Sequence, residues 1–262
     1  MVVPASTPSA PPSNAAPPPG SETLEVGGWQ VVVADGHAVL PEGMTHLPDR
    51  AFQHRASLVS VAFPRSLASI GERAFAFCSS LVSIDLPASL TSIGEQAFRD
   101  CSALTTAAFP AGLTSIGICA FSGCSSLVSI TLPASLTSIG TCAFYCCEAL
   151  ANVTFPAGLT SIDSHAFESC PSLIRVTVPT TATIGFGAFP LATIVRRLPP
   201  AKMRWYEAVD GALAYKRCRP LLYGWLERAQ TRLGSYGPDG AARQRDREEF
   251  EGDFAHLALH AD

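Results

Sequence analysis

Two stretches of this chain are nearly identical. Residues 78–98 read CSSLVSIDLPASLTSIGEQAF and residues 124–144 read CSSLVSITLPASLTSIGTCAF, so only three of the 21 aligned positions differ. The second stretch begins 46 residues after the first. Self-similarity at a fixed spacing is typical of repeat proteins, in which each repeat is one structural unit that stacks on its neighbours.

The underlying period is 23 residues, half the spacing of the two stretches. The pair Ala-Phe begins at residues 51, 74, 97, 120, 143, 166 and 188. Leucine and proline recur with the same step, and the unit reads L-x-x-I-x-L-P-x-x-L-x-x-I-G-x-x-A-F-x-x-C-x-x. One coil of this length cannot bury its own apolar face, so we expect the coils to stack and to share one continuous core.

Each repeat predicts two extended pieces. The I-x-L part alternates apolar and polar residues, which is strand periodicity, and the proline after it should end that strand. The S-I-G part predicts a second, shorter strand, and the glycine at Gly71 and its equivalents predicts a turn with positive φ. Pro48 takes this place in the first coil and cannot adopt positive φ, so we expect that coil to turn differently and to form an irregular N-terminal cap.

The core positions alternate in size from coil to coil. A small inner residue is followed two places later by Phe in one set, as at Ala107 and Phe109, and a larger one by Leu in the other, as at Ile84 and Leu86. A densely packed core requires the summed volume to stay nearly constant. We therefore interpret the 46-residue echo as a two-coil unit.

The pattern SLVSIDLPASLTSIGEQAFRDC at residues 80–101 resembles the BspA-type leucine-rich repeat. The resemblance extends over roughly residues 38–190, because Leu, Ile, Pro, Gly, Ala-Phe and Cys recur together at fixed spacing. It implies a curved, right-handed solenoid. It also implies roles in cell-surface adhesion, in binding host or matrix proteins, and in protein–protein contact generally.

Composition divides the chain into three parts. Residues 1–22 are rich in Pro, Ala and Ser and predict a disordered tail. Residues 23–190 predict a β-rich leucine-rich repeat solenoid of about seven coils. Residues 191–262 lose the repeat, and their apolar spacing predicts an α-helical C-terminal extension that either caps the open end of the solenoid or docks a partner.

The charge distribution limits the class of partner. The net charge of −4 offers no strong attraction to nucleic acid, but residues 191–234 carry 9 Lys and Arg against 3 Asp and Glu, which suits an acidic partner. No run of eighteen apolar residues predicts a transmembrane segment. The N-terminus lacks the pattern of a secretory signal, so we expect a cytoplasmic protein.

The chain contains nine cysteines, and five of them follow the repeat. These five are Cys78, Cys101, Cys124, Cys147 and Cys170. Stacked coils about 5 Å apart would allow disulfides, but an odd number in a core column favours small buried thiols.

A second group of cysteines raises the possibility of a zinc site. Cys119, Cys142, Cys146 and Cys147 lie near His165 in the repeat pattern, but a zinc site needs a further ligand pair of similar spacing. We expect no metal and no cofactor.

The chain also lacks catalytic motifs. It has no G-x-S-x-G, no P-loop, no H-E-x-x-H and no G-x-G-x-x-G, and its six histidines are scattered. General acid–base catalysis needs convergent ionisable groups, which these columns do not provide. We expect the protein not to be an enzyme.

Strand alternation places two polar columns outward beside the inward Ile. They form a neutral, hydroxyl-rich strip that contains Ser83, Asp85, Thr106, Ser129, Thr131, Asn152, Thr154, Arg175 and Thr177. Solenoids bind partners along such extended surfaces, although Ser and Thr also occur there simply as solvated, β-compatible residues. If the strip binds, Arg175 and Asn152 should matter most, because interface hot spots favour arginine.

These observations predict a non-catalytic leucine-rich-repeat scaffold that mediates protein–protein interaction. The alternative is a cell-surface adhesion or structural repeat protein.

Overall fold

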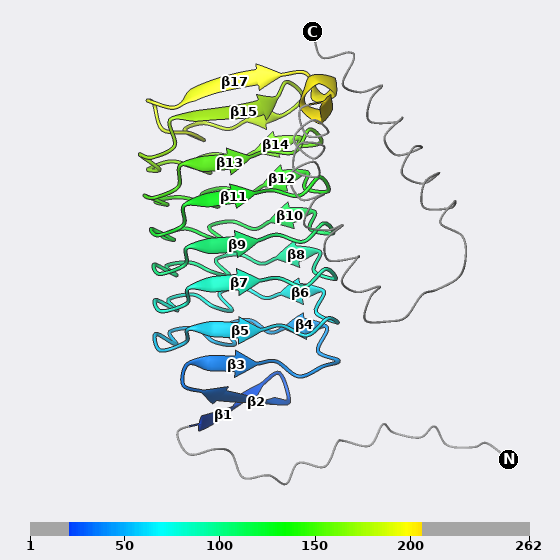
Figure 1. Ribbon diagram of the computed structural model, residues 1–262, viewed down its shortest axis with the longest axis vertical. Helices are drawn as coiled ribbons and strands as arrows, with labels where there is room; N and C mark the ends of the chain where they lie inside the picture. Colours follow the sequence, from blue (N-terminus) through cyan, green and yellow to red (C-terminus); the bar gives the residue numbers. More distant parts are fainter. Residues whose placement is uncertain (1–20, 206–262) are drawn as a thin grey trace, which may run out of the picture. The chain divides into compact units, whose positions relative to one another are not determined.

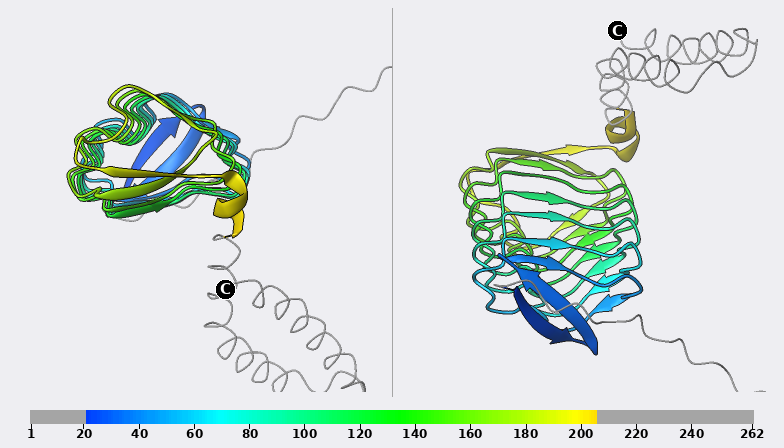
Figure 2. Two further views of the ribbon diagram at one scale, coloured as in Figure 1. Left: turned by 90° about the horizontal axis from the view of Figure 1, so that it is seen from above. Right: turned by 60° about the horizontal axis from the view of Figure 1, so that its bottom comes forward.

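The computed structural model describes residues 21–205, and those up to Pro200 belong to one compact unit. Figure 1 shows the strands of this unit following one another from the N-terminal end to the C-terminal end as a stack of coils. Seen along the stack in Figure 2, successive coils superimpose on one another. The predicted solenoid is confirmed.

Each regular coil contributes one longer and one shorter strand. The longer strands are β5 (Ser60–Ala62), β7 (Ser83–Asp85), β9 (Thr106–Ala108), β11 (Ser129–Thr131), β13 (Asn152–Thr154) and β15 (Arg175–Pro179). The shorter strands are β4 (His46–Leu47), β6 (Ser69–Ile70), β8 (Ser92–Ile93), β10 (Ser115–Ile116), β12 (Ser138–Ile139), β14 (Ser161–Ile162) and β16 (Thr183–Ile184). The longer strands β7, β9, β11 and β13 form one parallel sheet, and the shorter strands β4, β6, β8, β10, β12, β14 and β16 form another. In both sheets, residues one repeat apart face each other.

A ladder of phenylalanine rings runs through the centre of the stack. Its fully buried members are Phe52, Phe75, Phe98, Phe121, Phe144 and Phe167. Neighbouring rings are 5.1–5.3 Å apart between centroids and lie within 3–10° of parallel. The Leu and Ile columns are buried around them, so equivalent side chains of successive coils form common apolar columns, as the period predicts.

The predicted alternation between coils appears in how the second aromatic column packs. Phe109 meets the central Phe121 edge-on at 5.4 Å and 86°, and the same contact recurs in every second coil. The intervening coils place Leu86 and Leu132 there, both buried. The 46-residue echo therefore corresponds to two kinds of coil that alternate along the core.

The prediction that the repeat glycines adopt positive φ is wrong. Positive φ falls two residues later instead, for example at Arg73 (53°) and Gln96 (55°). The glycine column has another cause: a Cβ on Gly94 would lie 2.8 Å from the backbone carbon of Gly71, in the coil before it. Glycine is favoured there because the two backbones approach so closely that a side chain can enter only if one of them shifts, as the coil of Asp163 must allow.

The prediction that the first coil turns differently at Pro48 is also wrong. Arg50 has φ 58°, like its equivalents, and β4 pairs with β6 in the regular parallel register. Proline fits because this column does not require a left-handed residue. The Asp49 side chain accepts a hydrogen bond of 2.7 Å from the Glu72 backbone N–H, which further ties this coil to the next.

The N-terminal end is instead covered by two hairpins. Strands β1 (Ser21–Val26), β2 (Trp29–Ala34) and β3 (His37–Val39) pair antiparallel, and β3 then pairs in parallel with β5. Both turns have two residues with positive φ, Gly27-Gly28 and Asp35-Gly36, the geometry that two-residue hairpins favour. Residues 21 and 22, which composition assigns to the tail, belong to β1.

The C-terminal boundary of the solenoid also differs from the prediction. Residues 194–198, expected to begin a helical extension, form β17 (Ile194–Leu198), which pairs in parallel with β15. The shorter connection of 19 residues between paired positions hides this strand from a 23-residue pattern. Residues 200–205 are helical. The rest of the predicted extension, and residues 1–20 of the predicted tail, lie outside the described residues.

Candidate interaction surface

The nine residues predicted to bind a partner lie on one side of the solenoid. They lie on the solvent side of β7, β9, β11, β13 and β15, and we call this surface the strand face. Figure 1 shows these strands stacked one on another. All nine are exposed except Thr177, which is half-buried. The parallel register brings equivalent residues side by side, with Ser129 beside Asn152 and Thr131 beside Thr154.

The hydroxyls of the strand face differ in their hydrogen bonding from those beside the shorter strands. Beside the shorter strands, Thr114 Oγ1 donates to the Thr91 carbonyl at 3.2 Å, and Thr160 Oγ1 donates to the Thr137 carbonyl at 2.8 Å. Within residues 21–205, no such side-chain bond engages Ser129 or Thr131. Beside the shorter strands, threonine hydroxyls are thus used to join coils, whereas those of the strand face remain available.

Sequence reasoning missed an apolar column at the edge of the strand face. Val82, Val128 and Ile174 precede the longer strands by one residue, and they are 43%, 49% and 67% exposed. Their spacing of 46 residues follows the two-coil unit, so the same periodicity could have revealed them. They add contact area that the hydroxyl strip lacks.

The C-terminal end of the strand face includes residues of β17, which the sequence had assigned to a helical extension. In the pairing of β15 with β17, Ile194 lies beside Arg175 and Arg196 lies beside Thr177. Ile194 and Arg196 are exposed. This end of the face therefore combines Arg175 and Arg196 with Ile174 and Ile194. Arginine is one of the residue types enriched in interface hot spots.

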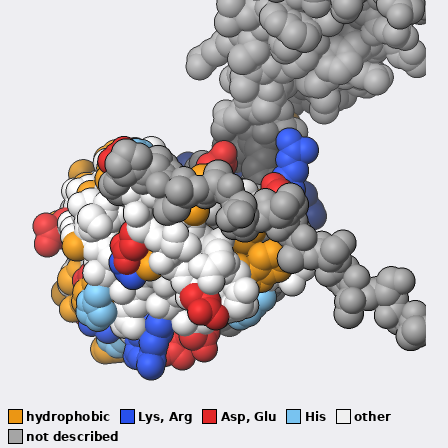
Figure 3. Space-filling model, turned by 90° about the horizontal axis from the view of Figure 1, so that it is seen from below, with side chains coloured by type: hydrophobic (Ala, Val, Ile, Leu, Met, Phe, Trp, Pro, Cys, Tyr) orange, Lys and Arg blue, Asp and Glu red, His pale blue; other side chains and the backbone are white. Residues whose placement is uncertain are grey.

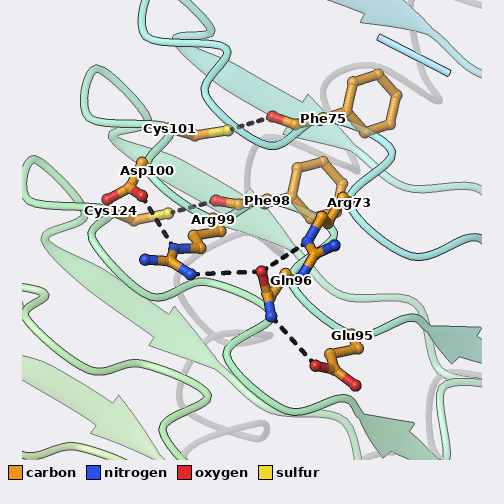
Figure 4. A network of polar contacts seen from close by, with 9 residues as sticks. All are labelled: Arg73, Phe75, Glu95, Gln96, Phe98, Arg99, Asp100, Cys101 and Cys124. Carbon is orange, nitrogen blue, oxygen red and sulfur yellow. Dashed lines mark hydrogen bonds and ion pairs between the residues drawn. The ribbon is translucent and has the colours of Figure 1, made fainter. Parts of the chain in front are cut away.

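Several charged side chains outside the strand face are paired with their own neighbours. Figure 4 shows Gln96 Oε1 accepting from Arg73 Nε at 2.9 Å and from Arg99 at 3.4 Å, while Arg99 Nε contacts Asp100 at 3.1 Å. By contrast, none of the ion pairs among residues 21–205 involves Arg175. At the N-terminal end, Figure 3 shows isolated acidic, basic and histidine side chains rather than a large field of one sign.

The five repeat cysteines are buried thiols, as predicted. Each S–H donates to the backbone carbonyl of a phenylalanine in the preceding coil, as Cys101 does to Phe75 at 3.1 Å and Cys124 to Phe98 at 3.3 Å (Figure 4). Burial raises the pKa of Cys78 from its ordinary 9.0 to about 12. Burial likewise raises the pKa of Cys101 and Cys124, so these groups are structural rather than reactive.

The side chains of the second cysteine group lie apart from further potential ligands among the described residues. Within residues 21–205, no three His, Cys, Asp or Glu side chains converge as ligands. Cys119, Cys142 and Cys146 are half-exposed free thiols, and His165 Nδ1 lies 2.7 Å from the Glu168 carboxylate.

A shallow polar depression of about 240 Å³ lies beside β14 and β16. Its lining includes Asp163, Ser164 and Thr183 but no second ionisable group. Acid–base catalysis requires two such groups with separated pKa values, and this lining does not supply them. In the part of the chain that the structure describes, no helix is long and apolar enough to cross a membrane.

Stacked coils with two parallel ladders and a common Leu, Ile and Phe core define a leucine-rich-repeat solenoid. The sequence matches the BspA type leucine rich repeat region in six copies, over residues 37–117 and 100–196. Because these ranges cover more than half of the chain, the protein belongs to the BspA-type leucine-rich repeat family.

The chain is also similar to solved structures of leucine-rich repeat proteins. A leucine-rich repeat protein of T. pallidum, TpLRR, is 29% identical with a TM-score of 0.53, over 70% of this chain and 86% of that one. A leucine-rich repeat protein from Bacteroides ovatus is 25% identical with a TM-score of 0.41, and the match covers 61% of this chain and 53% of that one. No curated protein sequence matches the chain.

Proposed function

We propose that this protein is a non-catalytic scaffold that binds a protein partner through the strand face. The observation that carries the proposal is the contrast between surfaces. Beside the shorter strands, threonine hydroxyls bond to the neighbouring coil, and charged side chains such as Arg73 and Arg99 bond to their own neighbours, whereas the strand face keeps its hydroxyls and Arg175 available. Solenoids with extended, regular surfaces bind partners in this way.

The composition of the strand face suggests the chemistry of the partner. Most of the face is neutral, which suits hydrogen-bonding groups, and its C-terminal end combines Arg175 and Arg196 with exposed Ile174 and Ile194. An acidic and apolar segment of the partner would complement this end. Arg196 also belongs to the basic segment 191–234, so the proposed acidic partner meets both features.

Arginine substitutions test the proposal. Proteins captured from the native source by the full chain are compared with those captured by Arg175→Ala and by Arg175→Ala with Arg196→Ala. We expect at least one specific partner to be lost, with a fall in affinity of about tenfold or more for a hot-spot arginine. Arg65→Ala is the matched control, because Arg65 is an exposed arginine outside the strand face. Capture of the same partners at equal yield by the double variant would reject the strand face as the binding site.

A truncated chain separates the solenoid from the segment that follows it. The truncation must end at or after residue 200, because an earlier end such as residue 195 would cut β17. Retained binding by a chain that ends at residue 205 supports the strand face. Binding that is lost on truncation but insensitive to Arg175→Ala would assign the contact to residues 206–262.

We also propose that the protein works in a reducing compartment, consistent with the expected cytoplasmic location. The described cysteines are free thiols, and disulfides are uncommon where glutathione keeps thiols reduced. Cell fractionation with thiol alkylation tests this proposal. Recovery of the protein in an extracellular or surface fraction would reject it.

A further inference from the structure

One column of the solenoid carries a left-handed residue in every coil. Its members follow the shorter strands by three residues and have φ between 53° and 63°. They are Arg50, Arg73, Gln96, Cys119, Cys142, His165 and Gly187. Two consecutive members of this column, Cys119 and Cys142, are thiols, and the buried cysteines belong to a different column.

The coils that carry these two thiols are stacked in register. Ile116 of β10 pairs with Ile139 of β12, and three residues later the Cys119 N–H donates to the Thr141 carbonyl at 2.9 Å. Two residues further on, the rings of the same two coils are 5.3 Å apart. The two Cα atoms are therefore separated by about 5 Å, within the range of roughly 4.4–6.8 Å that disulfides require.

Exposure separates this pair from the buried cysteines. Cys119 and Cys142 are half-exposed, so a small oxidant in solvent can reach them. The five buried thiols are stacked at a similar spacing, but they are enclosed and donate to backbone carbonyls. Cys146 is also half-exposed, yet its equivalents in the adjoining coils are Gly123 and Ser169, so no thiol is stacked on it.

The two thiol groups are neighbours in the stack, so Cys142 affects the ionisation of Cys119. Burial and the neighbouring Cys142 thiol raise the pKa of Cys119, and the positive charge of Arg99 offsets only part of this rise. Reaction with an oxidant requires the thiolate, so the oxidation should be faster at alkaline pH than at neutral pH.

We propose that Cys119 and Cys142 are a redox modification site, at which a peroxide joins two neighbouring coils by a reversible disulfide. One thiolate attacks the peroxide, an S–O bond forms, the O–O bond breaks, and the leaving hydroxide takes up a proton to become water. The second thiol attacks the sulfenic sulfur, the S–S bond forms, the S–O bond breaks, and a second water leaves. The two thiols lose two electrons and two protons, and hydrogen peroxide is reduced to two waters.

The stack geometry makes this disulfide easy to reduce. Cβ atoms in a disulfide are about 3.5–4.5 Å apart, whereas side chains in register on neighbouring coils start about 4.8 Å apart. The two coils must approach slightly at this corner when the bond forms. Exposed or strained disulfides have less negative reduction potentials, so reduced glutathione should reverse the modification.

Peptide mapping of the oxidised full chain tests the site. The protein is treated with hydrogen peroxide, its remaining thiols are alkylated after denaturation, and it is digested with chymotrypsin. Trypsin is unsuitable because the chain has no Lys or Arg between Arg99 and Arg175. We expect a cross-linked pair of peptides containing Cys119 and Cys142, with Cys146 largely alkylated, and we expect loss of the cross-link after treatment with reduced glutathione.

Matched serine variants make the test specific. Cys119→Ser and Cys142→Ser should each abolish the cross-link and leave a sulfenic acid on the remaining thiol, which dimedone traps, whereas Cys146→Ser should leave the cross-link unchanged. Thermal melts of the variants verify folding, and alanine replaces serine in any variant that does not fold. Oxidation of Cys146 before the pair, a disulfide from either cysteine to Cys146, or alkylation of both Cys119 and Cys142 after peroxide treatment would overturn the proposal.

Discussion

Gly117 lies so close to the preceding coil that a Cβ in place of its second Cα hydrogen would clash with the backbone. A Cβ at this position would be 2.8 Å from the backbone carbon and oxygen of Gly94. We expect Gly117→Ala to lower the free energy of unfolding by about 1–3 kcal/mol, because the coils must separate to admit a methyl group. Urea denaturation measures the change.

Gly158→Ala is the control for this prediction. Its Cβ would be 3.4 Å from the Ala134 carbonyl oxygen, an ordinary contact, and serine occupies the equivalent positions 89 and 135. We expect a change of less than about 0.5 kcal/mol. The glycine column is not continuous, because Asp163 takes the equivalent place two coils after Gly117, where it lines the shallow depression at β14 and β16. Equal losses for the two alanine variants would contradict the close-approach explanation.

The buried thiols make stability depend on pH in the alkaline range. Burial raises the pKa of Cys78 from 9.0 to about 12, so the native thiol keeps its proton where the unfolded chain has lost it. This contribution to stability is fully present below about pH 9 and is lost as the pH rises toward about 12. We therefore expect the Tm to fall between about pH 9 and pH 11.

Thermal melts across this range check the prediction. Cys78→Ala should reduce the slope of Tm against pH, and Cys146→Ser should leave it unchanged because Cys146 is half-exposed. A wild-type Tm that does not vary with pH would show that the buried thiols do not control alkaline stability.

At the scale of the element, the two aromatic columns contribute differently to each coil. Phe121 is fully buried between the rings of Phe98 and Phe144, whereas Phe109 is half-buried and meets Phe121 edge-on. We expect Phe121→Ala to cost about 3–5 kcal/mol, because it opens a cavity in the continuous ring ladder.

Phe109→Leu should cost less than about 1.5 kcal/mol, since Leu86 and Leu132 fill the equivalent place in neighbouring coils. Denaturant unfolding of both variants measures the difference. If Phe109→Leu lowers the free energy of unfolding as much as Phe121→Ala does, then Leu cannot replace Phe at this position, and the explanation from the packing of Leu86 and Leu132 is wrong.

The strands and their outward columns could be predicted element by element. Alternation within I-x-L identified the nine residues of the strand face, because a period of two places alternate side chains on opposite faces. The N-terminal hairpins were missed although Gly27-Gly28 and Asp35-Gly36 are strong turn signals, because a 23-residue period implies parallel pairing between coils and the hairpins pair antiparallel outside it. Strand β17 was missed because it pairs across 19 residues rather than 23.

At the scale of the whole molecule, stability should depend on which coils are neighbours. Deleting residues 81–126 removes 46 residues and two coils, and the coil of Phe63 then stacks on that of Leu132, which preserves the alternation. Deleting residues 81–103 removes one coil and brings the coils of Phe63 and Phe109 together. In a solenoid, stability is approximately a sum of coil and neighbour terms.

We therefore expect the shorter deletion to be the more damaging one. The 46-residue deletion should keep a single cooperative melt, whereas the 23-residue deletion should melt at a lower temperature because two coils with small inner residues face each other. Differential scanning calorimetry compares the two chains. A higher Tm for the 23-residue deletion would contradict the two-coil unit.

The amino-acid sequence by itself determined the period, the inward columns and the burial of five cysteines. It could do so because a coil of 23 residues cannot enclose its own apolar side chains, and equivalent residues must therefore meet when coils stack. Only the tertiary structure decided why the glycine column exists, which corner residues are left-handed, and how the N-terminal end is covered. These features depend on how closely one backbone approaches the next, and on strand pairing outside the repeat, neither of which recurs as a pattern along the chain.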